Sequence, residues 1–298
     1  MERKFILSCC STVDLPWDYM EDREIPVLPY TYMVDGVEYV DDMGRDPEAR
    51  PRFYAMLAEG KLPQTSQINV ARYTEFFEGL LRRGDVLHVA FTSGQSASVN
   101  NAFAAAADLR KRYPDRKLIV VDSLCSSSGY GLLVDLAADL RDAGRSIEET
   151  EAWLLANRNK VHHQFFSSDM TQFHRTGRVS GAAATVASIL NICPLMRLDA
   201  AGAIKAYDKV RGKKRAIAAT ADAMAAHAQG GTGYDQRCFV CHSEVPEDAA
   251  QLIRVLEERF PGLKGRIRLC HIGPVIGSHS GTGTVAVFFM GDERPVMD

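Results

Sequence analysis

Apolar runs of strand length alternate with helical patterns through the first half of the chain. The runs are Phe5–Cys9, Val86–Phe91 and Lys117–Val121. Helical patterns follow the last two runs, at Asn100–Tyr113, Ser127–Ala143 and Ile147–Asn157. Alternation of this kind predicts right-handed βαβ units and a mostly parallel sheet. The stretch from about residue 40 to Pro63, which holds Asp41, Asp42 and several prolines, is predicted to be irregular.

The pattern changes at about Val161. Strands are predicted at Val161–Ser167, Gln236–His242, Arg266–Ile272 and Val285–Phe289, with a hairpin over Pro194–Lys209 that turns at Asp199–Gly202. Helices are predicted at Gly181–Leu190, Lys213–Ala228 and Pro246–Phe260. The predicted fold class is therefore α/β, with a parallel-sheet domain over residues 1–160 and a separate α+β domain over residues 161–298. No low-complexity linker separates them, so we expect close packing and a ligand site between the two halves.

Composition and charge are those of a globular protein without a nucleic-acid surface. The chain has 298 residues, 46% of them hydrophobic, and a formal net charge of −3 with a pI near 6.3. Its start, Met1–Phe5, leads into a short strand rather than a signal-peptide core. No apolar run approaches the ~20 residues that span a bilayer. We expect a cytoplasmic protein with no integral membrane segment and at most transient membrane contact, which would carry a lipid ligand inside the fold.

Three loops rich in small polar residues mark a candidate binding site. They are Leu62–Gln67, Thr92–Ser98 and Ile272–Thr284, the last of which holds His279. Glycines let the backbone approach a ligand closely, and hydroxyls and imidazole donate hydrogen bonds without a fixed charge. A tight hairpin with a capping histidine would explain the last loop alone, but three such loops favour a shared site for a polar or anionic head group. GxxxxGK and GxSxG are absent from the sequence, so neither a P-loop nor a nucleophile elbow is indicated.

Seven cysteines, an odd number in a chain expected to be cytosolic, argue against a disulfide framework. Cys238–His242 has the CxxCH spacing of c-type haem attachment. It lies in an apolar run typical of a strand, where residues three apart point to opposite faces, so core cysteines are the preferred interpretation. We therefore predict no cofactor and no metal site.

Six short motifs resemble, in order and spacing, those of the DegV family of bacterial fatty-acid-binding proteins: Ser11–Pro16, Thr65–Gln67, Thr92–Ser96, Val121–Ser123, Thr176–Val179 and Gly273–His279. The resemblance covers nearly the whole chain. It implies a long-chain fatty acid ligand with its carboxylate held at Thr65, Ser93 and His279, and with Ser96 nearby. It also implies that the protein is not a catalyst. It would present the fatty acid to a separate fatty acid kinase, which makes an acyl phosphate.

The same resemblance implies a docking edge and shows two departures from the family pattern. Lys209 and Arg211 match a basic pair after the predicted hairpin, which implies contact with the kinase; a solvated strand end is the alternative interpretation.

Cys10 stands where family members usually have Asp, and Ser280 and Thr282 replace the Thr and Pro of the family's HTGPG. Both departures bear on the polar groups around the site.

Two classes of function are compatible with these residues. In a lipid carrier, the apolar helix Gly181–Leu190 and the alanine-rich helices would line a channel for the acyl tail. In an enzyme, Ser93, His279 and Asp122 would form a Ser-His-Asp unit of a hydrolase or acyltransferase acting on a lipid ester. The sequence leaves open the chain length and unsaturation of the lipid and the identity of the kinase. Turnover of a chromogenic ester separates the two classes.

Overall fold

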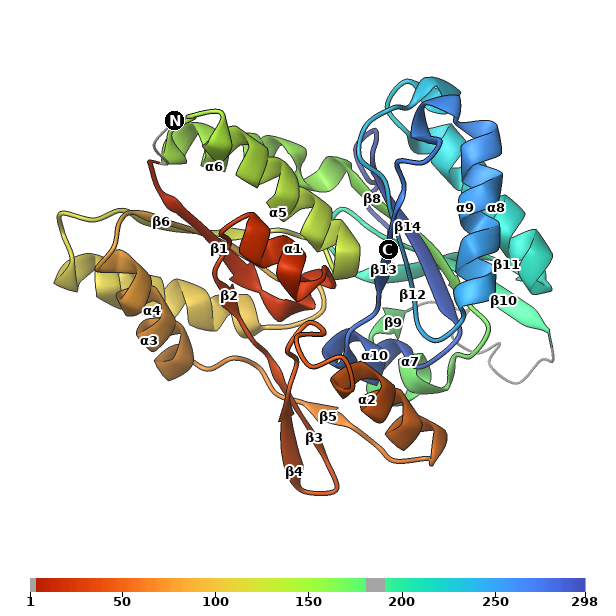
Figure 1. The fold of residues 1–298 in the computed structure, drawn as a ribbon, viewed down its shortest axis with the longest axis horizontal. Coiled ribbons are helices and arrows are strands. Elements are labelled where there is room, and N and C mark those ends of the chain that lie inside the picture. The colour runs from red at the N-terminus through yellow and green to blue at the C-terminus, as the bar shows by residue number, and fades with distance from the viewer. Residues whose placement is uncertain (1–3, 181–190, 298) are drawn as a thin grey trace.

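A four-stranded parallel sheet forms the N-terminal part of the computed structural model, which describes residues 4–180 and 191–297. Its strand order is β2 (Val27–Leu28), β1 (Ile6–Cys10), β6 (Val86–Ala90) and β7 (Leu118–Asp122). Two helices cover each face: α3 (Val70–Leu81) and α4 (Ser98–Arg112) on one, α5 (Ser127–Asp142) and α6 (Ile147–Asn157) on the other (Figure 1). The predicted parallel sheet is confirmed.

A second, mixed sheet of seven strands forms the C-terminal part. Its order is β13 (Arg268–His271), β12 (Phe239–His242), β14 (Thr284–Met290), β8 (Val161–Ser167), β10 (Ile192–Leu198), β11 (Ile204–Arg211) and β9 (Val179–Ser180). One face packs against α8 (Lys213–His227) and α9 (Pro246–Arg259), as Figure 1 shows. The predicted hairpin and both helices are confirmed with small changes at their ends. The predicted helix Gly181–Leu190 lies outside the described residues.

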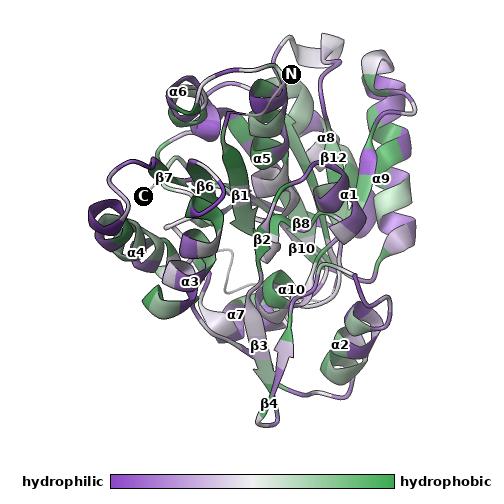
Figure 2. Ribbon diagram, turned by 60° about the vertical axis from the view of Figure 1, so that its left-hand side comes forward, coloured by the Kyte–Doolittle hydropathy of each residue, from purple (hydrophilic) through white to green (hydrophobic). Residues whose placement is uncertain are grey.

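Local sequence signals explain why these elements begin and end where they do. Helix α6 begins with a capping box, in which the Ser146 hydroxyl accepts from the Glu149 amide and the Glu149 carboxylate accepts from the Ser146 amide. Helix α9 begins with Pro246 in its first turn, where a missing N–H costs nothing. Figure 2 shows hydrophobic residues along β1 and β8 and mixed faces on α4 and α9, as expected for helices covering buried sheets.

Two loop predictions are wrong in part. Residues 40–63 contain helix α2 (Ala49–Ala58), which buries Phe53 and Tyr54, and they are flanked by a small sheet of β4 (Val37–Val40), β3 (Thr31–Val34) and β5 (Gln64–Thr65). The segment Ile272–Thr284, predicted as a loop, forms helix α10 (Pro274–Ser280). It begins with Pro274 after Gly273 and ends at Gly281, whose φ of 67° stops the helix.

Helix α5 joins the two parts. It contacts β1 of the parallel sheet and also β8, β12 and β14 of the mixed sheet. Gly129 makes this approach possible, because a Cβ there would overlap the His163 ring and lie 2.7 Å from Phe288 Cδ1. We propose the change at Lys160/Val161 as the boundary between two domains, since the parallel sheet ends before it and the mixed sheet begins after it. No helix within the described residues is long and apolar enough to cross a membrane.

Candidate functional site

A cavity of about 280 Å³ lies between the two parts of the molecule. Its apolar walls come from the mixed sheet, from α7 (Thr171–Thr176) and α10, and from residues that directly follow β6 and β13: Phe91, Phe165, Phe173, Leu198, Ile204, Ile272, Val275, Ile276, Ala286 and Phe288. Hydroxyl, amide, imidazole and guanidinium groups complete the lining, among them Thr12, Thr65, Gln67, Gln95, Ser96, Ser126, Ser127, His163, Arg178 and His279. A mostly apolar space with a few convergent polar groups is the usual form of a site for an amphipathic small molecule.

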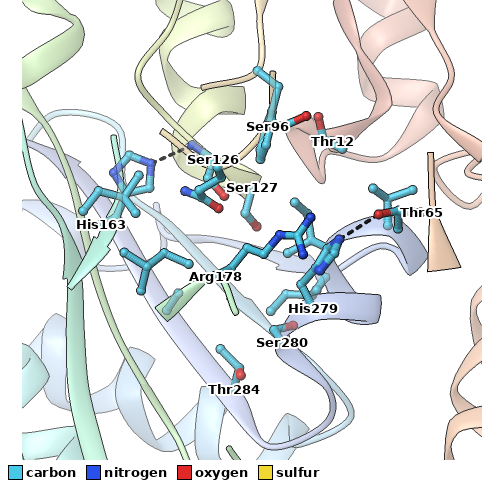
Figure 3. A pocket seen from close by; sticks show the side chains of 18 of the residues that line it. Thr12, Thr65, Ser96, Ser126, Ser127, His163, Arg178, His279, Ser280 and Thr284 are labelled. Atoms are coloured by element: carbon cyan, nitrogen blue, oxygen red, sulfur yellow. Dashed lines mark hydrogen bonds between the residues drawn. The ribbon is translucent and has the colours of Figure 1, made fainter. Parts of the chain in front are cut away.

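His279 lies at one wall of the cavity, in the last turn of α10. Its Nε2 is 2.8 Å from the Thr65 hydroxyl on β5, a contact between residues 214 positions apart (Figure 3). Its Nδ1 is buried and has no hydrogen-bond partner among the described residues. Burial, together with the positive charges of Arg178 and Arg175, lowers the pKa of His279 to about 4. The imidazole is therefore neutral at pH 7 and can donate one hydrogen bond to a bound anion.

Arg178 lines the same region and was not assigned to the site from the sequence. It follows the C-terminus of α7 (Thr171–Thr176), and Figure 3 shows its side chain reaching towards His279. Its guanidinium donates to the Thr176 carbonyl and carries a fixed positive charge. The sequence does contain a signal for this residue, because Arg178 is the basic residue of the Thr176–Val179 motif. Only the fold shows that this motif faces α10.

The predicted head-group residues do not all meet in the cavity. Thr65, Ser96 and His279 line it, whereas Ser93 is exposed and outside the lining. The Ser93 amide donates to the Asp122 carboxylate at 3.1 Å, so this residue shapes the loop after β6.

Three further hydroxyls that sequence reasoning missed line the cavity. Ser126 and Ser127 lie at the start of α5, and Thr12 lies in a short 3-10 helix after β1. The Ser126 amide donates to His163 Nε2 at 3.1 Å across the two parts of the molecule (Figure 3). The serine run after β7 was the available signal, since ligands of parallel sheets bind at the carboxyl ends of the strands.

Within the described residues, Ser93, His279 and Asp122 do not make the hydrogen bonds of a catalytic triad. Asp122 accepts from the amides of Ser93 and Leu124, and His279 Nε2 bonds the Thr65 hydroxyl. A Ser-His-Asp unit requires the histidine to bridge the serine hydroxyl and the carboxylate. These contacts give no support to catalysis by Ser93.

Two buried carboxyl groups hold the start of α10, and thereby His279. Asp14 accepts from the Gly273 amide at 3.0 Å and from the Ser127 hydroxyl at 2.5 Å. Asp41 accepts from the Val275 amide in α10 and from the Ser11 hydroxyl, the latter at 3.2 Å. Burial raises the pKa of Asp41 to about 7, and burial together with the Asp41 charge raises that of Asp14 well above its usual value.

The remaining residues singled out from the sequence have clear positions. Lys209 and Arg211 are exposed on β11. Cys10 is buried, with its sulfur 3.6 Å from the Tyr73 hydroxyl and 3.6 Å from His88 Nε2. Cys238 and Cys241 are both buried, as expected of core cysteines, and Cys241 lines the cavity.

Known proteins resemble this chain over nearly its whole length. A DegV domain-containing protein of Clostridium perfringens is 35% identical over 98% of this chain and 99% of its own length. Another from Lactococcus lactis is 31% identical over 93% of this chain and 94% of its own length.

Solved structures give the same result for the fold. A DegV family protein of Thermus thermophilus, described as binding fatty acid, has a solved structure that is 26% identical in sequence to this chain, with a TM-score of 0.84. The match covers 97% of this chain and 100% of that one. A DegV lipid binding protein of Thermotoga maritima is 25% identical with a TM-score of 0.82, covering 98% of this chain and 99% of that one. The DegV family model matches residues 10–292. This chain therefore belongs to the DegV family.

Proposed function

We propose that the protein binds one long-chain fatty acid in the cavity between its two parts. The observation that carries the proposal is the lining: apolar walls with one group of polar side chains that includes a partly buried neutral histidine and an arginine. The fatty acid binding described for the Thermus thermophilus relative supports it.

The acyl tail supplies most of the affinity. Each buried methylene contributes about 0.8 kcal/mol, so a sixteen-carbon tail gives on the order of 10 kcal/mol before the costs of association. The aromatic and aliphatic walls, such as Phe91, Phe165 and Phe288, provide the matching surface. An apolar cavity alone would accept any hydrocarbon, so the selectivity for an acid must come from the polar groups.

In this proposal the carboxylate lies beside His279, Thr65 and Arg178, with Ser96 nearby. The Thr65 hydroxyl donates to His279 Nε2, which leaves the ring proton on Nδ1 for the ligand. Among residues 4–180 and 191–297, His279 Nδ1 has no partner, Thr65 bonds Nε2 of the same ring, and the Arg178 charge lies close enough to lower the pKa of the imidazole. A bound carboxylate would offset that positive charge and accept from the imidazole N–H. Ser93 supports the neighbouring loop instead of touching the ligand.

The protein acts as a carrier, and a partner kinase performs the chemistry on the carboxylate. The hydrogen bonds of Ser93, His279 and Asp122 give no reason to assign turnover to this chain. The exposed basic pair Lys209 and Arg211 on β11 is the proposed contact for the kinase. If the head group lies between the two domains, the kinase can reach it by docking at the edge where the domains meet.

Native mass spectrometry of delipidated protein with added palmitate tests the proposal. We expect one fatty acid per chain at micromolar concentration and no turnover of a chromogenic long-chain ester. Absence of any complex would refute the binding site. Turnover of the ester that is lost in Ser93→Ala would favour the lipid hydrolase instead.

A further inference from the structure

A cluster of two histidines and one aspartate lies away from the cavity, near the C-terminus. His162 is on β8, His227 ends α8, and Asp292 follows β14. His162 Nε2 is 2.8 Å from one oxygen of the Asp292 carboxylate, and His227 Nδ1 is 3.2 Å from the other. One ligand atom from each residue lies within 4.8 Å of the others, a property unique to this group among the His, Cys, Asp and Glu side chains of the described residues.

We propose that His162, His227 and Asp292 form a Zn²⁺ site that fastens the C-terminal segment (residues 291–297) to β8 and α8. Two imidazoles and one carboxylate are a common donor set for Zn²⁺, with water in the fourth position. All three residues lie outside the lining of the cavity, so the proposal does not rest on the fatty acid site.

The backbone at the site is already assembled without an ion. The Asp292 amide donates to the carbonyl of His227, one of the proposed ligands, at 3.0 Å. The neighbouring Gly291 amide donates to the Lys160 carbonyl at 2.8 Å, two residues before the other ligand, His162. A Cβ on Gly291 would lie 2.7 Å from His162 Cδ2 and 3.1 Å from Nε2, so glycine keeps the space beside the ligand nitrogen open. The three ligand positions are therefore fixed relative to one another by the fold.

The side chains divide into one fixed ligand and two that can adjust. The His162 ring is buried and stacks between Phe289 and His227, with ring centroids 5.2 and 4.9 Å away. The side chains of His227 and Asp292 are 27% and 58% exposed, so they can move inwards. Zn²⁺ holds its nitrogen and oxygen ligands at roughly 2.0–2.2 Å, so tetrahedral ligand atoms lie about 3.3–3.5 Å apart. The two pairs now at 2.8 and 3.2 Å would therefore open slightly to admit the ion, and the two imidazole nitrogens would take up a similar separation.

The tautomer of His162 decides whether its Nε2 can bind the ion. A ring that carries its proton on Nδ1 leaves the Nε2 lone pair, which faces the Asp292 carboxylate, available to Zn²⁺.

The position of the site gives the ion a structural consequence. Two residues beyond Asp292, the buried Arg294 donates to the Leu124 carbonyl of the N-terminal part at 2.8 Å. The next residue, Pro295, accepts from the Ala200 amide in the turn between β10 and β11 at 2.9 Å. The C-terminal segment thus links the two parts of the molecule. An ion that anchors Asp292 would stabilise this link.

A competition titration with a chromophoric chelator tests the site on protein stripped with EDTA. We expect one Zn²⁺ per chain, a rise in Tm on adding Zn²⁺, and at least tenfold weaker binding in both His227→Ala and Asp292→Ala. His271→Ala is the matched control, because His271 is an exposed histidine beside another imidazole, His242, with ring centroids 4.9 Å apart. It should bind Zn²⁺ as the unaltered protein does.

Substitution of Co²⁺ identifies the ligands directly. We expect d–d bands of a nitrogen and oxygen site without the charge-transfer band of thiolate ligands. Undiminished binding in both variants, a thiolate band, or the absence of stoichiometric binding would overturn the proposal and leave a hydrogen-bonded contact without an ion. His227 and Asp292 are partly exposed, so these variants should fold, and retained fatty acid binding verifies it.

Discussion

Replacing His279 with alanine tests the proposed carboxylate site most directly. The ring bonds Thr65 at 2.8 Å and has one buried nitrogen without a partner in the part of the chain that the structure describes. A hydrogen bond to a charged group contributes about 1.5–3 kcal/mol, so its loss should weaken fatty acid binding by a factor of roughly 10 to 150. The apolar walls are unchanged, so the contribution of the tail should stay the same. The effect should therefore appear for acids and be nearly absent for the matching methyl esters.

The assay is displacement of a fluorescent fatty acid by palmitate, methyl palmitate and hexadecanol at pH 7.5. Ser93→Ala is the matched control, since Ser93 lies outside the cavity lining and should change palmitate binding less than about twofold. Thr65→Val and the double variant complete a cycle, in which we expect the two losses to be less than additive because the residues bond each other. Equal losses for acid and ester, with an unchanged Tm, would show that the carboxylate lies elsewhere.

Three further predictions concern stability and partner contact. Burial raises the pKa of Asp41 to about 7, so its stabilising contribution is complete below about pH 4 and is lost as the pH rises through 7. The stability of Asp41→Asn relative to the unaltered protein should therefore rise between about pH 4 and 7 in urea unfolding and level off above that, and a constant difference would contradict this. Gly129→Ala should lower the free energy of unfolding by about 1–3 kcal/mol because its Cβ would meet His163 and Phe288, which an unchanged urea midpoint would disprove. Arg211→Ala should keep palmitate affinity but slow acyl-phosphate formation with the kinase. Arg116 is an exposed arginine between α4 and β7, and Arg116→Ala should leave acyl-phosphate formation unchanged. Full activity of Arg211→Ala would mean that β11 is only a solvated edge.

The sequence by itself determined the type and order of most elements. The alternation of apolar strands with amphipathic helices up to Asn157 predicts a parallel sheet, because each strand needs cover on both faces. Local signals such as the capping box at Ser146 decide a helix start without reference to the rest of the chain. The motifs at Thr65 and His279 likewise identified two groups that meet in the cavity.

Only the tertiary structure decided which of the polar residues share a site. Ser93 has the same local chemistry as Ser96, yet one lies outside the cavity and the other lines it. The sequence predicts a loop at Pro274–Ser280, where the structure has a helix, because the small polar residues there have weak helix propensity. The start of this helix is held at Gly273 by Asp14, which lies 259 residues away in the sequence. Contacts between residues so far apart depend on how two sheets pack, and no pattern within one segment encodes that packing.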